Sequence, residues 1–179
     1  MKFKIQNAII NSNEVGKMFK VNDYIIYNKD VCMIKEIKEK FYKDMDYYVL
    51  MSISDPSLKI QIPTNSNKIR KLISLEELND IINIIPNIEI IKENDRLIEN
   101  TYKTLMQNGT HEDLIKIIKT TYLRNQKRSE NNKKISEIDD SYFKKAEKYL
   151  YNEFSVVLNK TFDETKEYII NKVLEQKTI

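Results

Sequence analysis

The sequence predicts an α+β protein, in which a small β barrel is followed by an all-α helical bundle. Between residues 19 and 72, short runs of β-branched and aromatic residues alternate with turn residues about every 8–12 positions, a pattern typical of small barrels and sandwiches. After residue 74 the apolar residues recur instead at spacings of three and four, which indicates amphipathic helices.

Amino-acid composition limits the classes of protein and function to which this chain can belong. The chain has 179 residues, of which 41% are hydrophobic and 32% charged, with a net charge of +3. These values fit one or two globular domains, and so small a charge gives no argument for nucleic-acid binding by itself. The single cysteine, Cys32, rules out a disulfide within the chain and fits a reducing compartment.

We divide the chain into four parts. They are an N-terminal extension (residues 1–17), a β domain with one helix (18–86), a linker (87–91) and a helical domain (92–179). The codons for residues 14–16 can resemble a ribosome-binding site, and we hypothesise that translation begins at Met18. The extension would then not be made.

Four strands are expected in the β domain. They cover residues 23–27, 31–37, 47–53 and 58–62. In the last strand apolar and polar residues alternate, and Pro63 ends the run. Alternation indicates a half-buried strand, and proline suits a sheet edge because it has no N–H to donate. We therefore expect an edge strand that can pair with another protein.

Five helices are expected after the strands. Ser74 and Glu77 form a capping box for a helix that ends before Pro86. A second helix covers residues 92–107 and ends at Asn108-Gly109. The remaining three helices begin at Thr110, Ser136 and Thr161. Short loops between them favour an antiparallel bundle.

No catalytic constellation is present in the sequence. His111 is the only histidine, which argues against a histidine-based triad or metal site; we expect it to cap a helix or face solvent. Asp139 and Asp140 are adjacent on one helix, so they point about 100° apart and are interpreted as a solvated helix start. We expect no enzyme activity, no cofactor and no metal.

One basic cluster interrupts the otherwise even charge pattern. Its members are Lys116, Lys119, Arg124, Lys127, Arg128, Lys133 and Lys134, against the single acid Glu130. Such a cluster can neutralise several phosphates, and Lys144, Lys145 and Lys148 on the next helix can extend it. A solvated helix face without a ligand, in a lysine-rich chain, is the favoured explanation of the same pattern when the cluster is considered by itself.

Several segments, in this order, resemble the CarD/CdnL family of bacterial transcription regulators. They are residues 19–27 (FKVNDYIIY), 48–50 (YVL), 60–63 (IQIP), Arg70, 74–78 (SLEEL), 105–109 (LMQNG), 122–128 (YLRNQKR), 143–146 (FKKA) and 149–154 (YLYNEF). The resemblance covers residues 18–160. Each segment is short, and their order and spacing together carry the assignment.

The resemblance implies a fold and two partners. It implies that the β domain is an SH3/Tudor-like barrel, shared with transcription-repair coupling factor, that pairs an exposed strand with the RNA polymerase β subunit. It implies that the helical domain contacts promoter DNA at the upstream edge of the bubble and modulates open-complex stability, for example at rRNA promoters. We expect a cytoplasmic monomer, associated with the nucleoid through polymerase and with no membrane contact.

The resemblance also nominates site residues. For polymerase they are Lys40, Tyr42, Lys59, Gln61 and Ile62. For DNA they are Asn94, Arg96, Arg124, Lys127, Arg128, Lys144, Lys145 and Lys148. Lys40 and Gln61 align where the family often places basic residues.

Three departures from the family pattern bear on these expectations. Residues 27–33 lack the family's proline and glycines, Asn94 aligns with the family's tryptophan wedge, and residues 139–141 are acidic where relatives tend to be basic. An amide cannot replace an indole's stacking surface, so we expect weaker or differently placed DNA contacts. Two alternatives remain open: a Tudor-like nucleic-acid module or a helical interaction scaffold, each acting without polymerase.

Overall fold

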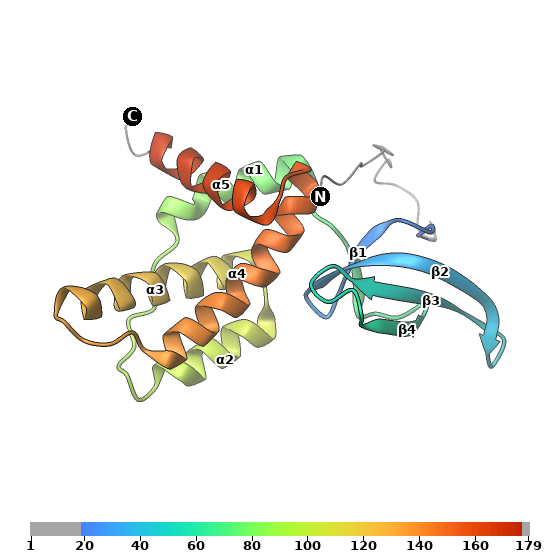
Figure 1. The fold of residues 1–179 in the computed structure, drawn as a ribbon, viewed down its shortest axis with the longest axis horizontal. Helices are drawn as coiled ribbons and strands as arrows, with labels where there is room; N and C mark the ends of the chain where they lie inside the picture. Colours follow the sequence, from blue (N-terminus) through green and yellow to red (C-terminus); the bar gives the residue numbers. More distant parts are fainter. Residues whose placement is uncertain (1–18, 177–179) are drawn as a thin grey trace.

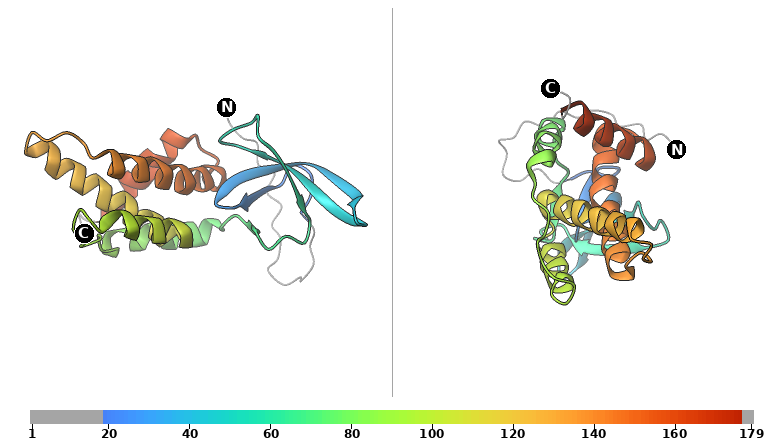
Figure 2. Two further views of the ribbon diagram at one scale, coloured as in Figure 1. Left: turned by 90° about the horizontal axis from the view of Figure 1, so that it is seen from below. Right: turned by 90° about the vertical axis from the view of Figure 1, so that its left-hand side faces the viewer.

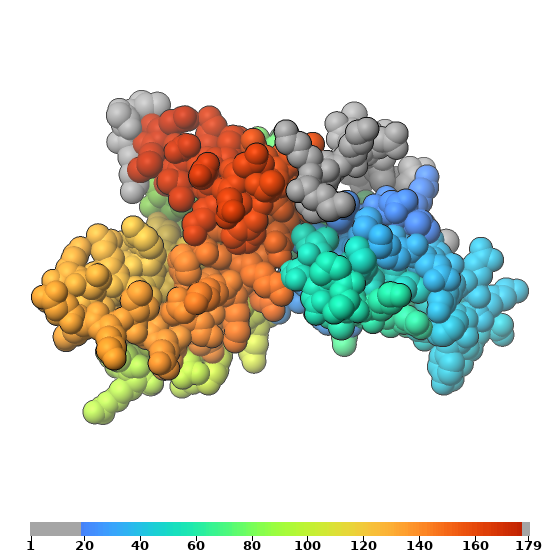
Figure 3. Space-filling model, in the orientation of Figure 1, coloured from blue at the N-terminus to red at the C-terminus, as the bar shows by residue number. Residues whose placement is uncertain are grey.

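A computed structural model describes residues 19–176 as a five-stranded antiparallel sheet followed by five α-helices (Figure 1). This confirms the expected α+β class. The sheet and the helices form two lobes that lie side by side along the long axis, as the further views also show (Figures 2 and 3). The hypothesis about residues 1–17 lies outside the described residues.

The sheet has β4 and β5 at its two edges. Its strands are β1 (Tyr24–Tyr27), β2 (Asp30–Tyr42), β3 (Met45–Ser52), β4 (Lys59–Pro63) and β5 (Ile69–Lys71). The order is β4-β3-β2-β1-β5, and every neighbouring pair is antiparallel. The strand with alternating residues that ends at Pro63 is therefore an edge strand, as expected. Closure of the sheet into a barrel stays a prediction.

The hairpin of β2 and β3 is longer than the sequence predicted. β2 was expected to end at Ile37 but continues to Tyr42, because a register shift between Lys38 and Tyr42 keeps the charged segment in the ladder. Lys40 takes φ +45° there, a local irregularity of the kind found in β-bulges. Lys43 and Asp44 both have positive φ, 51° and 54°, which is the geometry of a two-residue type I′ turn.

The sheet buries one small core. It consists of Ile25, Cys32, Ile34, Tyr48, Leu50 and Ile62. The Tyr48 hydroxyl accepts a hydrogen bond from the Phe19 N–H at 3.1 Å. Burial first, and then the charge of Asp30, raises the pKa of the Cys32 thiol to about 11, so this cysteine is a core residue and not a reactive one.

The helices begin where the expected caps lie. They are α1 (Leu75–Ile84), α2 (Ile98–Asn108), α3 (His111–Glu130), α4 (Glu137–Leu158) and α5 (Phe162–Gln176), with a 3₁₀ turn, η1, at Ile85–Asn87. The side chains of Ser74, Thr110, Ser136 and Thr161 each accept a backbone N–H of the first turn. Gly109 ends α2 at φ +64°. Only α2 differs clearly, since it begins six residues later than the predicted start at Lys92.

The helical core includes α1, which was expected to belong to the β domain. Leu78 and Ile82 of α1 pack in one cluster with Tyr102, Leu114 and Phe154. The expected linker packs against the same cluster, through residues 88 and 91. The Lys119 ammonium donates to the carbonyls of residues 85, 86 and 88, so a member of the basic cluster fastens this segment. By packing, the division between the lobes falls near residue 73.

A buried carboxylate joins the two lobes. The side chain of Glu153 on α4, 3% exposed, accepts from the Arg70 guanidinium at 2.6 and 2.8 Å, from the Ile73 N–H at 3.1 Å and from His111 Nε2 at 2.9 Å. Burial acts to raise the pKa of Glu153, but the hydrogen bonds from Arg70 and His111 outweigh it and lower the pKa to about 2. Beside this joint, Val156 of α4 packs on Ile26 of the sheet.

His111 differs from its expected role. Its side chain is 18% exposed, and its ring stacks on Phe154 at 5.7 Å between centroids. It therefore braces the joint instead of capping a helix or facing solvent. In the chain from residue 19 to 176, no helix has the length and apolarity needed to cross a bilayer.

Candidate partner and nucleic-acid surfaces

Of the five residues expected to contact polymerase, two have exposed side chains on the edge strand β4. Lys59 and Gln61 are exposed and Ile62 is 5% exposed, because alternate side chains of a strand point to opposite faces. The Ile62 side chain packs in the sheet core. It can serve a partner strand only through its backbone, and the side chains of Lys59 and Gln61 remain for recognition.

Lys40 and Tyr42 lie at the tip of the β2–β3 hairpin, here called the hairpin tip (residues 38–47). Phe41 and Tyr42 are 50% and 54% exposed. Ammonium groups lie over both rings: Lys38 is 4.6 Å from the Phe41 centroid and Lys43 is 5.3 Å from the Tyr42 centroid. The tip adjoins the edge strand, because Tyr47 is paired with Pro63 at the end of β4.

Phe41 was not among the residues that the sequence predicted to contact a partner. Its exposure follows from the continuation of β2 to Tyr42, which the charged segment did not suggest. The two exposed aromatic rings are of the residue type that is enriched in interface cores, while the lysines beside them are typical of an interface rim. The hairpin tip and the β4 edge are neighbouring candidate surfaces for a protein partner, because the tip lies at the Pro63 end of β4.

Asn94, nominated as a DNA contact, stabilises its own loop. Its Oδ1 accepts from the backbone N–H groups of Arg96 and Leu97 at 3.0 and 3.2 Å, which is an Asx turn ahead of α2. The amide oxygen is therefore occupied, which weakens its nomination as a base contact. The Arg96 side chain is exposed next to it.

Arg124 is also engaged within the protein. Its Nε donates to Asp139 Oδ2 at 3.1 Å, and its Nη2 donates to Asp95 Oδ1 at 2.6 Å. Asp139 is fully buried and accepts from the Tyr102 hydroxyl at 2.9 Å, so the expectation of a solvated aspartate is wrong. The hydrogen bond and the charge of Arg124 lower the pKa of Asp95. Arg124 thus stabilises the junction of α2, α3 and α4 and has little capacity left for phosphate.

A basic hollow lies at the turn from α3 to α4. This α3–α4 hollow has a volume of about 290 Å³ and is lined by Asp95, Arg124, Lys127, Arg128, Asn131 and Lys133. Lys127 and Lys133 are exposed, and Arg128 is held in place by its Nε bond to the Lys134 carbonyl at 2.9 Å. Since Arg124 is neutralised by two aspartates, these three cations give the hollow its positive charge.

The α4 lysines face solvent along that helix. Lys144 pairs with Asp140 at 2.7 Å, and Lys145 and Lys148 lie 5.6 and 5.9 Å from the ring centroids of Tyr142 and Tyr149. Such exposed contacts are weak, so these lysines can exchange them for a phosphate. These three lysines are accessible, as a contact with DNA would require.

The partner surface and the basic hollow lie at opposite ends of the molecule. In Figure 1 the β2–β3 hairpin forms the right-hand end, and the turn from α3 to α4 forms the left-hand end.

Within residues 19–176, no three His, Cys, Asp or Glu side chains are grouped so as to hold a metal ion. Neither the scan against protein-family models nor the search of curated proteins finds a match to this chain.

Proposed function

We propose that this protein is a non-enzymatic transcription regulator that binds the RNA polymerase β subunit through β4 and contacts promoter DNA with its helical lobe. It would act at the upstream edge of the bubble and modulate the stability of the open complex, as the CarD/CdnL resemblance implies. In this proposal the sheet lobe is an SH3/Tudor-like barrel.

The observation that carries the proposal is the outer edge of β4 beside the hairpin tip, which no other strand of residues 19–176 pairs with. An exposed edge strand presents unpaired backbone groups that another strand can join. Polar side chains at Lys59 and Gln61 keep this edge from pairing indiscriminately. The exposed rings of Phe41 and Tyr42, at the end of β2, supply apolar area for a specific partner beside the Pro63 end of β4.

The DNA contacts are proposed for the exposed cations and not for all nominated residues. Lys127, Arg128 and Lys133 form the positive part of the α3–α4 hollow. The other nominated cations with exposed side chains are Arg96 before α2 and Lys144, Lys145 and Lys148 on α4. Lysines and arginines on phosphates position a protein on DNA without reading its sequence. Arg124 and Asn94 support this surface from within, because their polar atoms are already bonded.

A binding assay with the isolated β subunit tests the proposal. Lys59→Glu combined with Gln61→Glu places two acids on the edge strand, and we expect at least a tenfold loss of affinity in biolayer interferometry. The matched control is Lys71→Glu on β5, the opposite edge of the sheet, which should bind as the wild type does. Equal affinity for all three proteins would refute the strand assignment.

The basic hollow also supports a second function, nucleic-acid binding without polymerase. With this function, the protein would bind duplex DNA or RNA without polymerase, and its affinity would fall steeply as the salt concentration rises. Lys127→Glu with Lys133→Glu would abolish this binding, and the β4 variant would leave it unchanged. Binding to the β subunit together with only weak DNA binding by the free protein favours the first proposal.

A further inference from the structure

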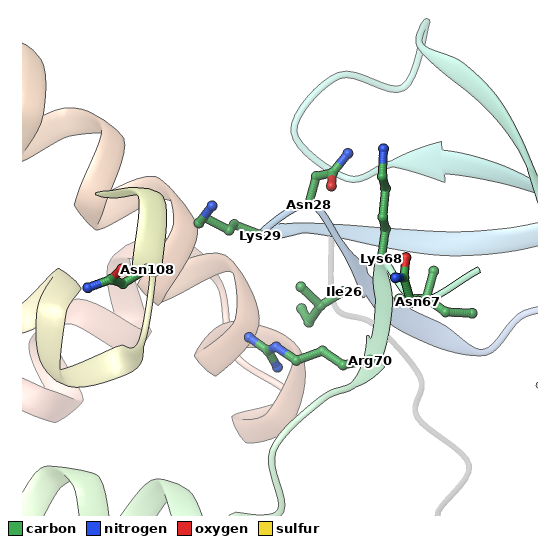
Figure 4. A pocket seen from close by; sticks show the side chains of 9 residues that line it. Ile26, Asn28, Lys29, Asn67, Lys68, Arg70 and Asn108 are labelled. Atoms are coloured by element: carbon green, nitrogen blue, oxygen red, sulfur yellow. The ribbon is translucent and has the colours of Figure 1, made fainter. Parts of the chain in front are cut away.

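A second recess lies where the sheet lobe meets the helical lobe (Figure 4). This junction recess has a volume of about 230 Å³ and is lined by Ile26, Asn28, Lys29, Asn67, Lys68, Ile69, Arg70, Asn108 and Gly109. The lining comes from the β1–β2 turn, from β5 with the loop before it, and from the end of α2. It is separate from both surfaces assigned above.

The lining carries three cations and no acid. Arg70 is paired with Glu153. Lys29 and Lys68 have no carboxylate within ion-pair distance anywhere in residues 19–176. The three cations point in different directions from the rim of the recess (Figure 4), and the two unpaired lysines give this part of the surface a positive potential that an anion would relieve.

Buried groups hold Arg70 in position. Glu153, whose side chain is 3% exposed, binds both terminal nitrogens of the guanidinium, while the Arg70 side chain itself remains 46% exposed. In Figure 4 the Arg70 side chain reaches from the sheet toward the helices. Nη1 also donates to the Lys71 carbonyl at 3.0 Å, so the Nε–H and one N–H of Nη2 remain for a ligand. Because the guanidinium is already fixed, it needs little reorganisation to bind one.

Lys29 is held by backbone geometry. It lies in the two-residue turn between β1 and β2 at φ +74°, a conformation that is uncommon for lysine. Its side chain crosses Gly109, where a Cβ would lie 2.2 Å from the Lys29 Cε and 2.7 Å from its Cδ. The absence of a side chain at residue 109 therefore lets Lys29 extend along the end of α2, as Figure 4 shows.

The chemistry of the lining identifies the class of ligand. Cations combined with the side-chain amides of Asn28 and Asn67 suit the oxygens of a phosphate group, which accepts several hydrogen bonds. Pockets for drug-sized ligands measure about 300–1,000 Å³, so this smaller recess suits a compact ligand. We propose that the junction recess binds a small phosphorylated anion about the size of pyrophosphate.

An NMR titration of the full chain tests this site. Pyrophosphate is added to ¹⁵N-labelled protein at an ionic strength held constant with sodium chloride. We expect saturable shifts of the Lys29, Lys68 and Gly109 amides, and at least tenfold weaker binding in Lys29→Gln with Lys68→Gln. Lys35→Gln with Lys172→Gln removes two exposed charges elsewhere and should bind as the wild type does.

A second arm distinguishes a free anion from the nucleic-acid backbone. A short DNA duplex replaces pyrophosphate in the same titration. Shifts at these amides with DNA but not with pyrophosphate would overturn the proposal, because the recess would then serve the DNA backbone. Equal pyrophosphate affinity of wild type and Lys29→Gln/Lys68→Gln would overturn it as well.

Discussion

At the scale of single residues, two buried carboxylates link elements that are distant in the sequence. Glu153 links α4 to β5 and to α3, and Asp139 links α4 to Arg124 and Tyr102. A buried carboxylate is tolerated because several donors satisfy it. Removing it leaves the donors without a partner, so these two residues have more effect on folding than any surface charge.

Glu153→Gln is expected to destabilise the protein by about 2–3 kcal/mol. Removing one partner of a buried ion pair costs about 3–5 kcal/mol, and the cost is reduced here because the Arg70 side chain is 46% exposed and water can solvate it. Urea unfolding measures the change. Glu89→Gln, in a pair whose side chains are both 76% exposed, should change the free energy of unfolding by less than about 0.5 kcal/mol. A Glu153 effect as small as this control would contradict the account.

The same carboxylate predicts an acid dependence. The pKa of Glu153 falls from its ordinary 4.5 to about 2 on folding. A carboxyl whose pKa is lowered stabilises the protein fully above the unfolded pKa, and this contribution is lost as the pH falls from about 4.5 toward 2. Between pH 5.5 and 3, the wild type should lose more unfolding free energy than Glu153→Gln. Parallel losses in the two proteins would show that another carboxylate is responsible.

At the scale of elements, the β2–β3 hairpin contributes the most unusual backbone. Lys40, Lys43 and Asp44 all have positive φ, although side chains with a Cβ disfavour this region. The Asp46 carboxylate stabilises the irregular part by accepting from the Lys40 N–H at 2.9 Å. The hairpin therefore extends beyond the sheet core and exposes Phe41 and Tyr42.

Lys43→Asn with Asp44→Gly should stabilise the protein by about 1 kcal/mol. Asn-Gly is the preferred sequence of a type I′ turn because both positions need positive φ. Lys43→Val should instead destabilise it, since a β-branched residue resists this conformation. Thermal unfolding compares the two variants with the wild type. Shifts of the melting temperature in the same direction would contradict the turn assignment.

Local patterns predicted five helices and four of the five strands. The short strand β5 (Ile69–Lys71) was not predicted, and long-range contacts between side chains could not be predicted from local patterns. The helix caps at Ser74, Thr110, Ser136 and Thr161 depend on neighbours three residues away, so the sequence displays them. Arg124 and His111 were misread because their partners lie 15 and 42 residues away. Nothing local to a lysine or arginine indicates that a distant carboxylate has already engaged it.

At the scale of the whole molecule, the candidate protein surface and the candidate DNA surface lie at opposite ends of the long axis (Figure 1). Between them, Glu153, Arg70, Ile73 and His111 connect the lobes. Such an arrangement suits a protein that bridges polymerase and upstream DNA, because the joint sets the orientation of one surface against the other. In the proposed function both surfaces act together on one complex.

Measuring the lifetime of the open complex tests whether the two surfaces act together. Open complexes of the cognate polymerase at a ribosomal promoter are challenged with competitor DNA, with and without the protein. We predict that the wild type changes the lifetime and that Lys59→Glu with Gln61→Glu removes this effect, while Lys71→Glu retains it. A lifetime that is the same with and without the wild-type protein would contradict the account.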